Sequence, residues 1–222
     1  MSRTRTEWSI TAKDLDWIEA TGRPPHPVLV DMEAAADEHE RISIVSRDSG
    51  RVLAMLAANR RRVVEIGTAI GYSTLWMGLA LPTGATIVTI DPDRARTDRA
   101  RGFWRAAGLP DDRVSVVNAP ALEALAGSTP ELAGPFDMVF IDALKHEYLA
   151  YLDALMDRLT PGAVVVADNV LWSGRTSGAR PSVPGDGSDA LREFCARGSA
   201  DPAFETAILP IGDGILVATL RP

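Results

Sequence analysis

The stretch Val63-Val-Glu-Ile-Gly-Thr-Ala-Ile-Gly-Tyr-Ser73 decides the fold of this chain. It opens with a short aliphatic run, and two glycines, Gly67 and Gly71, follow that run closely. A buried strand, a glycine-rich turn and the start of a helix are typical of the first unit of a doubly wound α/β sheet. In such sheets ligands bind at the carboxyl ends of the strands. We therefore expect a ligand site at this turn.

Similar aliphatic runs follow along the chain at Thr86–Ile90, Val114–Val117, Met138–Ile141 and Ala163–Ala167. Helical segments are expected between them, near residues 73–81, 93–107, 120–126 and 146–159. Short apolar strands that alternate with helices indicate a parallel sheet with helices on both faces. Two later runs, Glu205–Pro210 and Ile215–Leu220, are separated by a turn signal at residues 211–214. This hairpin predicts an antiparallel strand at the C-terminal end of the sheet.

A helical pattern marks the first sixty residues, with helices expected at Val28–Arg41 and Ser46–Ala58. The strand-forming core is expected over residues 61–222. A segment rich in Gly, Ser, Pro and Arg, Ser173–Ser188, is expected to be a long loop. The length of 222 residues fits one domain, so the sequence predicts a single domain over residues 1–222.

The composition excludes several classes of protein. With 23 basic and 30 acidic residues the formal net charge is −7, which argues against a general nucleic-acid binder or a polybasic membrane anchor. The single cysteine, Cys195, cannot form an internal disulfide or a cysteine-based zinc site. The uncharged run Ile66–Ile90 is interrupted by glycine and proline, so we expect no membrane span there. No apolar signal segment opens the sequence, and a cytoplasmic protein is predicted.

Two acidic residues at strand ends predict the kind of ligand. The loop has the spacing G-x-x-x-G and lacks the middle glycine that lets a pyrophosphate approach. Glu65 would repel a phosphate and suit a cationic or amino-bearing ligand such as S-adenosylmethionine. Asp91 follows the second run and is placed to bind the hydroxyls of a ribose. The alternatives are a nicotinamide-dependent oxidoreductase, or simple turn glycines with Asp91 as a helix cap.

Oxygen-bearing side chains follow two further runs. Asp142 comes after the fourth run, and Asp168 and Asn169 come after the fifth. Two carboxylates and an amide oxygen at neighbouring strand ends suit Mg²⁺, which accepts few protein ligands and keeps open positions. The alternative is that Asp168 and Asn169 only turn the chain.

Lysine is rare in this chain, because Lys13 and Lys145 are the only lysines among its 23 basic residues. Lys145 follows Asp142 by three residues. A lysine near a divalent cation can lose its proton and act as a base, whereas an arginine stays protonated. A surface ion pair of Lys145 with Asp142 or Glu147 is the alternative. Trp172 is a candidate wall for an aromatic ligand, or a core residue.

Several motifs in a fixed order then indicate a family. They are Val45-Ser-Arg-Asp-Ser-Gly50, Glu65-Ile-Gly67 with Gly71-Tyr-Ser73, Asp91, Ala119-Pro-Ala121, Phe140-Ile-Asp142 with Lys145 and Tyr148, Asp168-Asn-Val-Leu-Trp172, and Leu209-Pro-Ile-Gly-Asp-Gly214. Over roughly residues 40–220 the chain resembles the divalent-cation-dependent O-methyltransferases, which include caffeoyl-CoA and catechol O-methyltransferases. Plant-type members usually carry an aspartate where this chain has Leu144, and many relatives carry Glu or Gln at Ser49.

The resemblance implies a role for each matching position. The methionine part of S-adenosylmethionine would be held by Glu65, Gly67, Thr68, Gly71 and Ser73, with the backbone near Val45. The ribose would be bound by Asp91, and the adenine would be bordered by Ala119, Pro120 and Ala121. The metal ligands would be Asp142, Asp168 and Asn169. Asp142 would also contact the cofactor, and Lys145 would be the catalytic lysine. The implied fold is a Rossmann-like seven-stranded sheet, mostly parallel, with an antiparallel C-terminal hairpin strand.

The implied reaction is methylation of one hydroxyl of a catechol-type acceptor, either a small molecule or a CoA ester. S-adenosylmethionine and Mg²⁺, or another divalent cation such as Mn²⁺ or Ca²⁺, would be the cofactors. Trp172 would contact the acceptor ring, and the N-terminal region would help to form the acceptor site. The resemblance also implies a homodimer. A methyltransferase fold kept only as a non-catalytic binding module remains a second alternative.

Overall fold

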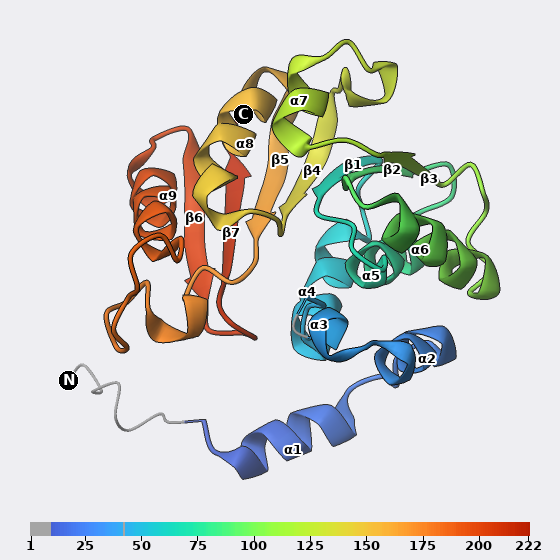
Figure 1. The fold of residues 1–222 in the computed structure, drawn as a ribbon, viewed down its shortest axis with the longest axis horizontal. Helices are drawn as coiled ribbons and strands as arrows, with labels where there is room; N and C mark the ends of the chain where they lie inside the picture. The colour runs from blue at the N-terminus through green and yellow to red at the C-terminus, as the bar shows by residue number, and fades with distance from the viewer. Residues whose placement is uncertain (1–9, 42) are drawn as a thin grey trace.

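A seven-stranded sheet runs through the computed structural model, which describes residues 10–41 and 43–222 (Figure 1). Its strands are β1 (Arg62–Ile66), β2 (Thr86–Ile90), β3 (Val114–Val117), β4 (Phe136–Ile141), β5 (Leu159–Ala167), β6 (Phe204–Leu209) and β7 (Ile215–Leu220). The strand order is β3-β2-β1-β4-β5-β7-β6. Strands β1 to β5 pair in parallel, whereas β7 lies antiparallel between β5 and β6. The predicted fold class is confirmed.

The register of the parallel strands brings their carboxyl ends to one level. Ile66 at the end of β1 pairs with Ile90 of β2 and with Ile141 of β4. Ile141 in turn pairs with Ala167, the last residue of β5. The residues that follow these strands therefore meet at one edge of the sheet, where doubly wound folds bind their ligands.

Helices cover both faces of the sheet. One face packs against α2 (Pro27–Ala35), α4 (Arg47–Ala57), α5 (Tyr72–Ala80) and α6 (Arg94–Ala106); the other packs against α7 (Ala121–Ala126), α8 (Tyr148–Leu155) and α9 (Ser188–Ala200). Neighbouring strand residues point to opposite faces, so Val63 joins the first core and Val64 the second. Burial on both faces explains the apolar runs of β1, β2, β4 and β5, whereas β3 at the edge of the sheet is only partly buried.

The N-terminal helices differ from the prediction. The single helix expected over Val28–Arg41 is wrong, because α2 ends at Ala35 and a separate short helix, α3 (Glu38–Arg41), follows. Asp37 and Glu40 separate them: each carboxylate accepts a hydrogen bond from the other residue's backbone N–H, at 2.8 and 3.0 Å. Such reciprocal bonds start a new helix. Helices α1 (Ala12–Thr21) and α9 were not expected from the pattern.

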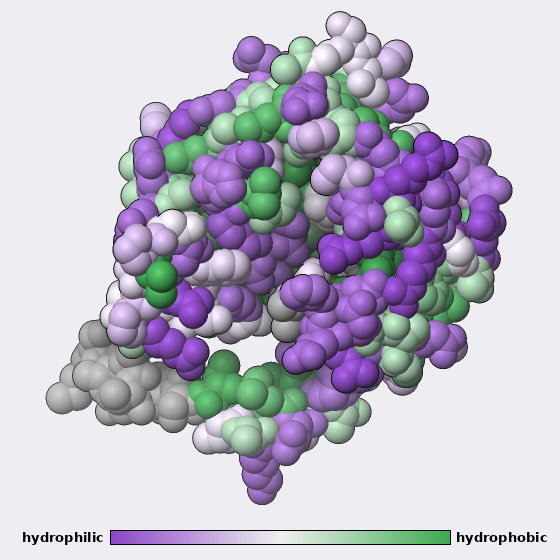
Figure 2. All heavy atoms as spheres, viewed as in Figure 1, coloured by the Kyte–Doolittle hydropathy of each residue, from purple (hydrophilic) through white to green (hydrophobic). Residues whose placement is uncertain are grey.

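Helix α1 lies apart from the sheet and contributes no buried residue. Its apolar side chains Leu15, Trp17 and Ile18 are exposed, and Figure 2 shows hydrophobic residues gathered along this helix. Glu19 connects α1 to α4 through ion pairs with Arg47 at 2.9 Å and Arg51 at 2.6 Å. Among the described residues, no helix combines the length and apolar character needed to cross a membrane.

Substituting Gly67 by alanine should lower the free energy of unfolding by about 3 kcal/mol or more. Gly67 has φ +101°, and a Cβ there would lie 2.1 Å from the carbonyl oxygen of Asp142. Gly102, in the exposed middle of α6, has open space around it, so Gly102→Ala should stabilise by about 0.5–1 kcal/mol. Urea denaturation of both variants measures the difference. Equal midpoints would contradict the close approach of the β1 and β4 ends.

Candidate active site

Glu65, the fourth residue of β1, is fully buried beneath the glycine loop. One carboxylate oxygen accepts a hydrogen bond from the Ser73 hydroxyl at 2.6 Å. The other accepts from Thr74 at 2.5 Å and from Thr89 at 2.6 Å. The hydroxyls of Thr89 and Thr68 are also 2.6 Å apart. The carboxylate is therefore held in one orientation, with Ser73 between it and the cavity above.

Burial raises the pKa of Glu65 from 4.5 to about 7, although the three hydroxyls act in the opposite direction. The folded protein therefore keeps a proton on Glu65 that the unfolded chain has already released. Stability should fall as the pH rises from about 4.5 to about 7, at a slope on the order of 1 kcal/mol per pH unit. Glu65→Gln should make this slope shallower, measured as thermal stability against pH, and the raised pKa of Asp168 accounts for the part that remains. Glu205→Gln, at an exposed carboxylate, is the control and should keep the wild-type slope.

Asp91 follows β2 and holds the neighbouring loops together. Its two carboxylate oxygens accept hydrogen bonds from the backbone N–H groups of Ala69 and Asp93, each at 2.8 Å. Ala69 belongs to the glycine loop and has φ +46°, so the bond fixes a left-handed turn. A carboxylate oriented in this way can still accept hydrogen bonds from a ligand's hydroxyls.

Lys145 lies at the centre of a polar cluster beyond β4 and β5. Its Nζ donates to Oδ1 of Asp142 at 2.8 Å, to Oδ1 of Asn169 at 2.6 Å and to the hydroxyl of Tyr148 at 2.7 Å. The Lys145 ammonium also lies 5.5 Å from the ring centroid of Trp172. Lys145 therefore forms the ion pair with Asp142 and contacts the Asn169 amide oxygen at the same time. The ammonium occupies the position between the oxygens that the sequence predicts as metal ligands.

Asp168 completes this cluster and is 3% exposed. Its Oδ1 is buried without a hydrogen-bond partner in the described part of the chain. Burial, and then the nearby charge of Asp142, raise the pKa of Asp168 to about 7. An unpartnered carboxylate oxygen beside a second carboxylate and the Asn169 amide oxygen fits a divalent cation with oxygen ligands. Across residues 10–41 and 43–222, no group of three His, Cys, Asp or Glu side chains is placed to hold a metal.

A first cavity of about 710 Å³ opens above the glycine loop. Of the predicted site residues, Val45, Gly67, Thr68, Ser73, Asp91, Pro120, Ala121, Asp142, Lys145, Asn169 and Trp172 line it. Glu65, Gly71 and Ala119 are not part of its wall. Glu65 is covered by Ser73, and Gly71 packs under Trp104, whose indole N–H donates to the Gly71 carbonyl at 2.9 Å. Glu65 and Gly71 therefore support the glycine loop from below.

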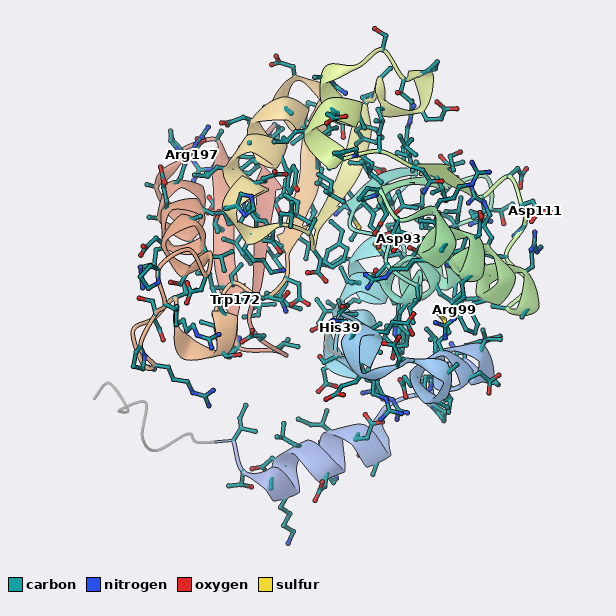
Figure 3. All side chains as sticks on the ribbon, viewed as in Figure 1. His39, Asp93, Arg99, Asp111, Trp172 and Arg197 are labelled. Atoms are coloured by element: carbon teal, nitrogen blue, oxygen red, sulfur yellow. The ribbon has the colours of Figure 1, made fainter. Side chains whose placement is uncertain are left out.

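A second cavity of about 640 Å³ lies on the N-terminal side of the cluster. Asp168 and Asn169 form one part of its wall, and Arg41 of α3 and Glu33 of α2 form another. The first and second cavities share Ile44, Val45, Tyr72 and Asn169 as walls. In Figure 3, Trp172 and His39 of α3 lie on opposite sides of the centre of the view. The oxygen cluster therefore lies where the two cavities meet.

Several residues of the site carried no predicted role. Thr74 and Thr89 bind Glu65, and Tyr148 is a hydrogen-bond partner of Lys145. Tyr72 borders both cavities and donates its hydroxyl proton to Glu33 at 2.5 Å. Thr89 carried a signal, because a threonine inside an apolar, doubly covered strand needs a buried partner. Glu33 carried none, since its helix joins the site only in the folded chain.

Comparison with known proteins gives consistent matches. Residues 22–221 match the O-methyltransferase family. A catechol O-methyltransferase from Mycobacterium tuberculosis is 36% identical over 94% of this chain and 96% of its own length. Caffeoyl-CoA O-methyltransferase 1 from Eucalyptus globulus is 33% identical over 87% of this chain and 81% of its own. The crystal structure of an O-methyltransferase from Bacillus cereus in complex with SAH superposes with a TM-score of 0.80 at 29% identity, over 93% of this chain and 96% of that one.

Proposed function

Because the chain belongs to the O-methyltransferase family, we propose that it transfers a methyl group from S-adenosylmethionine to one hydroxyl of an aromatic vicinal diol, with a divalent cation bound at Asp142, Asp168 and Asn169. The family expected from the sequence motifs is confirmed. The nicotinamide-dependent oxidoreductase belongs to a different family and is set aside. A catalytically inactive binding module is tested by the experiment below.

The first cavity suits S-adenosylmethionine. The Bacillus cereus relative was crystallised with SAH, the product that remains when this cofactor loses its methyl group. In this chain Asp91 presents a carboxylate to hydroxyls of a ribose, and Ser73 presents a hydroxyl that Glu65 orients. Pro120 and Ala121 supply an apolar wall for a flat base. The acidic groups near the glycine loop favour the cofactor's ammonium and sulfonium charges.

The observation that carries the proposal is the unpartnered Oδ1 of Asp168 beside Asp142 and Asn169. A buried carboxylate oxygen without a hydrogen bond is unfavourable unless a ligand completes it. A divalent cation held there would lower the pKa of a coordinated hydroxyl and fix its orientation. The second cavity borders the same two residues, Asp168 and Asn169, so an acceptor placed there has its hydroxyls at the cluster.

Lys145 performs the proton transfer in this proposal. Its Nζ faces the oxygens of Asp142 and Asn169, and so it lies within reach of an acceptor hydroxyl brought to those oxygens. Lys145 in its neutral form would take the hydroxyl proton, while Tyr148 holds the amine through a 2.7 Å contact. Tyr72 lines both cavities and Trp172 lines the first, and their rings would limit the access of water to the reacting groups. Positioning of the two reactants then supplies much of the acceleration.

The test is methylation of 4-methylcatechol by S-adenosylmethionine with Mg²⁺, then with EDTA, then with Mg²⁺ restored. We expect turnover that stops with EDTA and returns with Mg²⁺. Turnover that EDTA leaves unchanged would contradict the cation site but keep the methyl transfer. Binding of S-adenosylmethionine without methylation of any diol would favour the binding module. Sedimentation of the same sample tests the homodimer, which stays a prediction.

A further inference from the structure

Glu33 and Arg47, which both line the second cavity, neutralise each other in an ion pair. Arg47 donates from Nε and one terminal nitrogen to the two carboxylate oxygens of Glu33, at 2.9 and 2.6 Å, and reaches Glu19 at 2.9 Å. Asp213, in the turn between β6 and β7, accepts the backbone N–H of Ser173 at 2.7 Å. That bond fixes Asp213 against the segment that carries Asp168 and Asn169, on the side of the proposed cation.

Arg41 lies in the same wall as Arg47 but is bonded differently. It lines the second cavity from α3, and its Nε donates to the carbonyl oxygen of Ala36 at 3.1 Å. That bond directs the guanidinium without using its terminal nitrogens. Within residues 10–41 and 43–222, no carboxylate forms an ion pair with Arg41, whereas Arg47 in the same wall has two. A guanidinium without an acidic partner, on the wall of a cavity, is suited to bind a carboxylate of a ligand.

The cavity is also larger than a bare diol ring requires. Its volume of about 640 Å³ lies in the range of sites that bury drug-sized ligands. Asp168 and Asn169 occupy one part of the wall and Arg41 another, so a ligand with its hydroxyls at the first can extend toward the second. The wall also includes the apolar Ile44 and Val45. Oxygen-bearing side chains, a guanidinium and apolar side chains in one cavity match an aromatic ring that carries both a diol and an acid.

We propose, resting on the function proposed above, that the acceptor carries a free carboxylate opposite its vicinal diol and that Arg41 binds this carboxylate. Arg41 is then a specificity-determining residue, because it distinguishes acidic acceptors from neutral ones. Its guanidinium can bind a carboxylate through two parallel hydrogen bonds, which an ammonium cannot reproduce.

The experiment compares 3,4-dihydroxybenzoate with 4-methylcatechol, which has the same diol and no charge. In the wild type, kcat/KM should be higher for 3,4-dihydroxybenzoate. In Arg41→Gln, the ratio of kcat/KM for the acid to that for 4-methylcatechol should fall by roughly tenfold or more, through a higher KM for the acid. Arg41→Lys should recover part of the ratio. Calorimetric titration of 3,4-dihydroxybenzoate should show the same loss of affinity without turnover.

Arg105→Gln is the matched control, because Arg105 is an exposed arginine on α6 that lines neither cavity. It should keep the wild-type ratio. An unchanged ratio in Arg41→Gln would overturn the assignment, whether both rates fall together or neither changes. A third arm uses the CoA thioester of 3,4-dihydroxycinnamate: loss confined to this ester would mean that Arg41 binds a phosphate and would also overturn it. If the wild type methylates 4-methylcatechol and its kcat/KM for 3,4-dihydroxybenzoate is no higher, this inference alone is overturned. If the wild type methylates neither acceptor, the proposed function is overturned as well.

Discussion

Asp168→Asn should reduce Mg²⁺-dependent methylation at least about 100-fold, because the variant loses the buried negative charge of the proposed cation site. Asparagine keeps the shape of the side chain, so packing around residue 168 should change little. Affinity for S-adenosylmethionine should stay close to that of the wild type, since Asp168 does not line the first cavity. Steady-state kinetics across a Mg²⁺ titration, with calorimetry for the cofactor, measure both effects.

The same variant should not lose stability in EDTA. The pKa of Asp168 is raised to about 7, so at pH 8 the folded protein holds an ionised, poorly solvated carboxylate. Such a group lowers stability as the pH rises from about 3.8 to about 7, and asparagine removes this effect. Asp189→Asn, at an exposed position on α9, is the control for both measurements. A large fall in melting temperature for Asp168→Asn, together with lost cofactor affinity, would mean that Asp168 has a structural role.

Lys145→Met should lower kcat by roughly 10²- to 10⁴-fold, the usual contribution of a positioned general base. The KM values for acceptor and cofactor should change only a few-fold, because the variant keeps Asp142, Asn169 and the cavity walls. Lys145→Arg should not restore kcat, since a guanidinium stays protonated.

The control for this position is Lys13→Met, because Lys13 is the chain's other lysine and is exposed on α1. It should behave as the wild type. If Lys145→Met keeps full turnover, the proton leaves by another route and the contacts of Lys145 with Asp142 and Asn169 serve structure alone. If Lys145→Arg restores turnover, a fixed positive charge is sufficient and proton transfer to residue 145 is excluded.

The sequence predicts the parallel part of the sheet well because most of those strands are buried on both sides. Runs such as Thr86–Ile90 coincide with β2, and they leave little alternative to a covered parallel strand. The position of β7 between β5 and β6 could not be predicted, because the turn signal says only that β6 and β7 pair with each other. The pairing of β7 with β5 depends on side-chain packing between distant segments.

Some site residues could likewise be predicted from the sequence, and others could not. The strand ends predicted that Asp142, Asp168 and Asn169 would be neighbours, because parallel strands end at one edge. The sequence could not show that Glu65 lies beneath the cavity rather than in its wall, because this depends on which side of β1 faces α5 and on the hydroxyls of Thr74 and Thr89. Helix α1 was missed for a different reason: it buries no side chain, and its start is marked only by the capping pair Thr11 and Asp14.

The antiparallel direction of β7 determines where a label can be attached. Along β7 the pairing with β5 moves from Ala167, opposite Leu216, back to Val164, opposite Thr219. The chain therefore ends on the edge of the sheet away from the cavities, and Figure 1 marks the C-terminus there. A biotin or fluorophore joined after Pro222 should leave the site open to solution. Surface-immobilised protein tethered in this way should bind S-adenosylmethionine as tightly as free protein does.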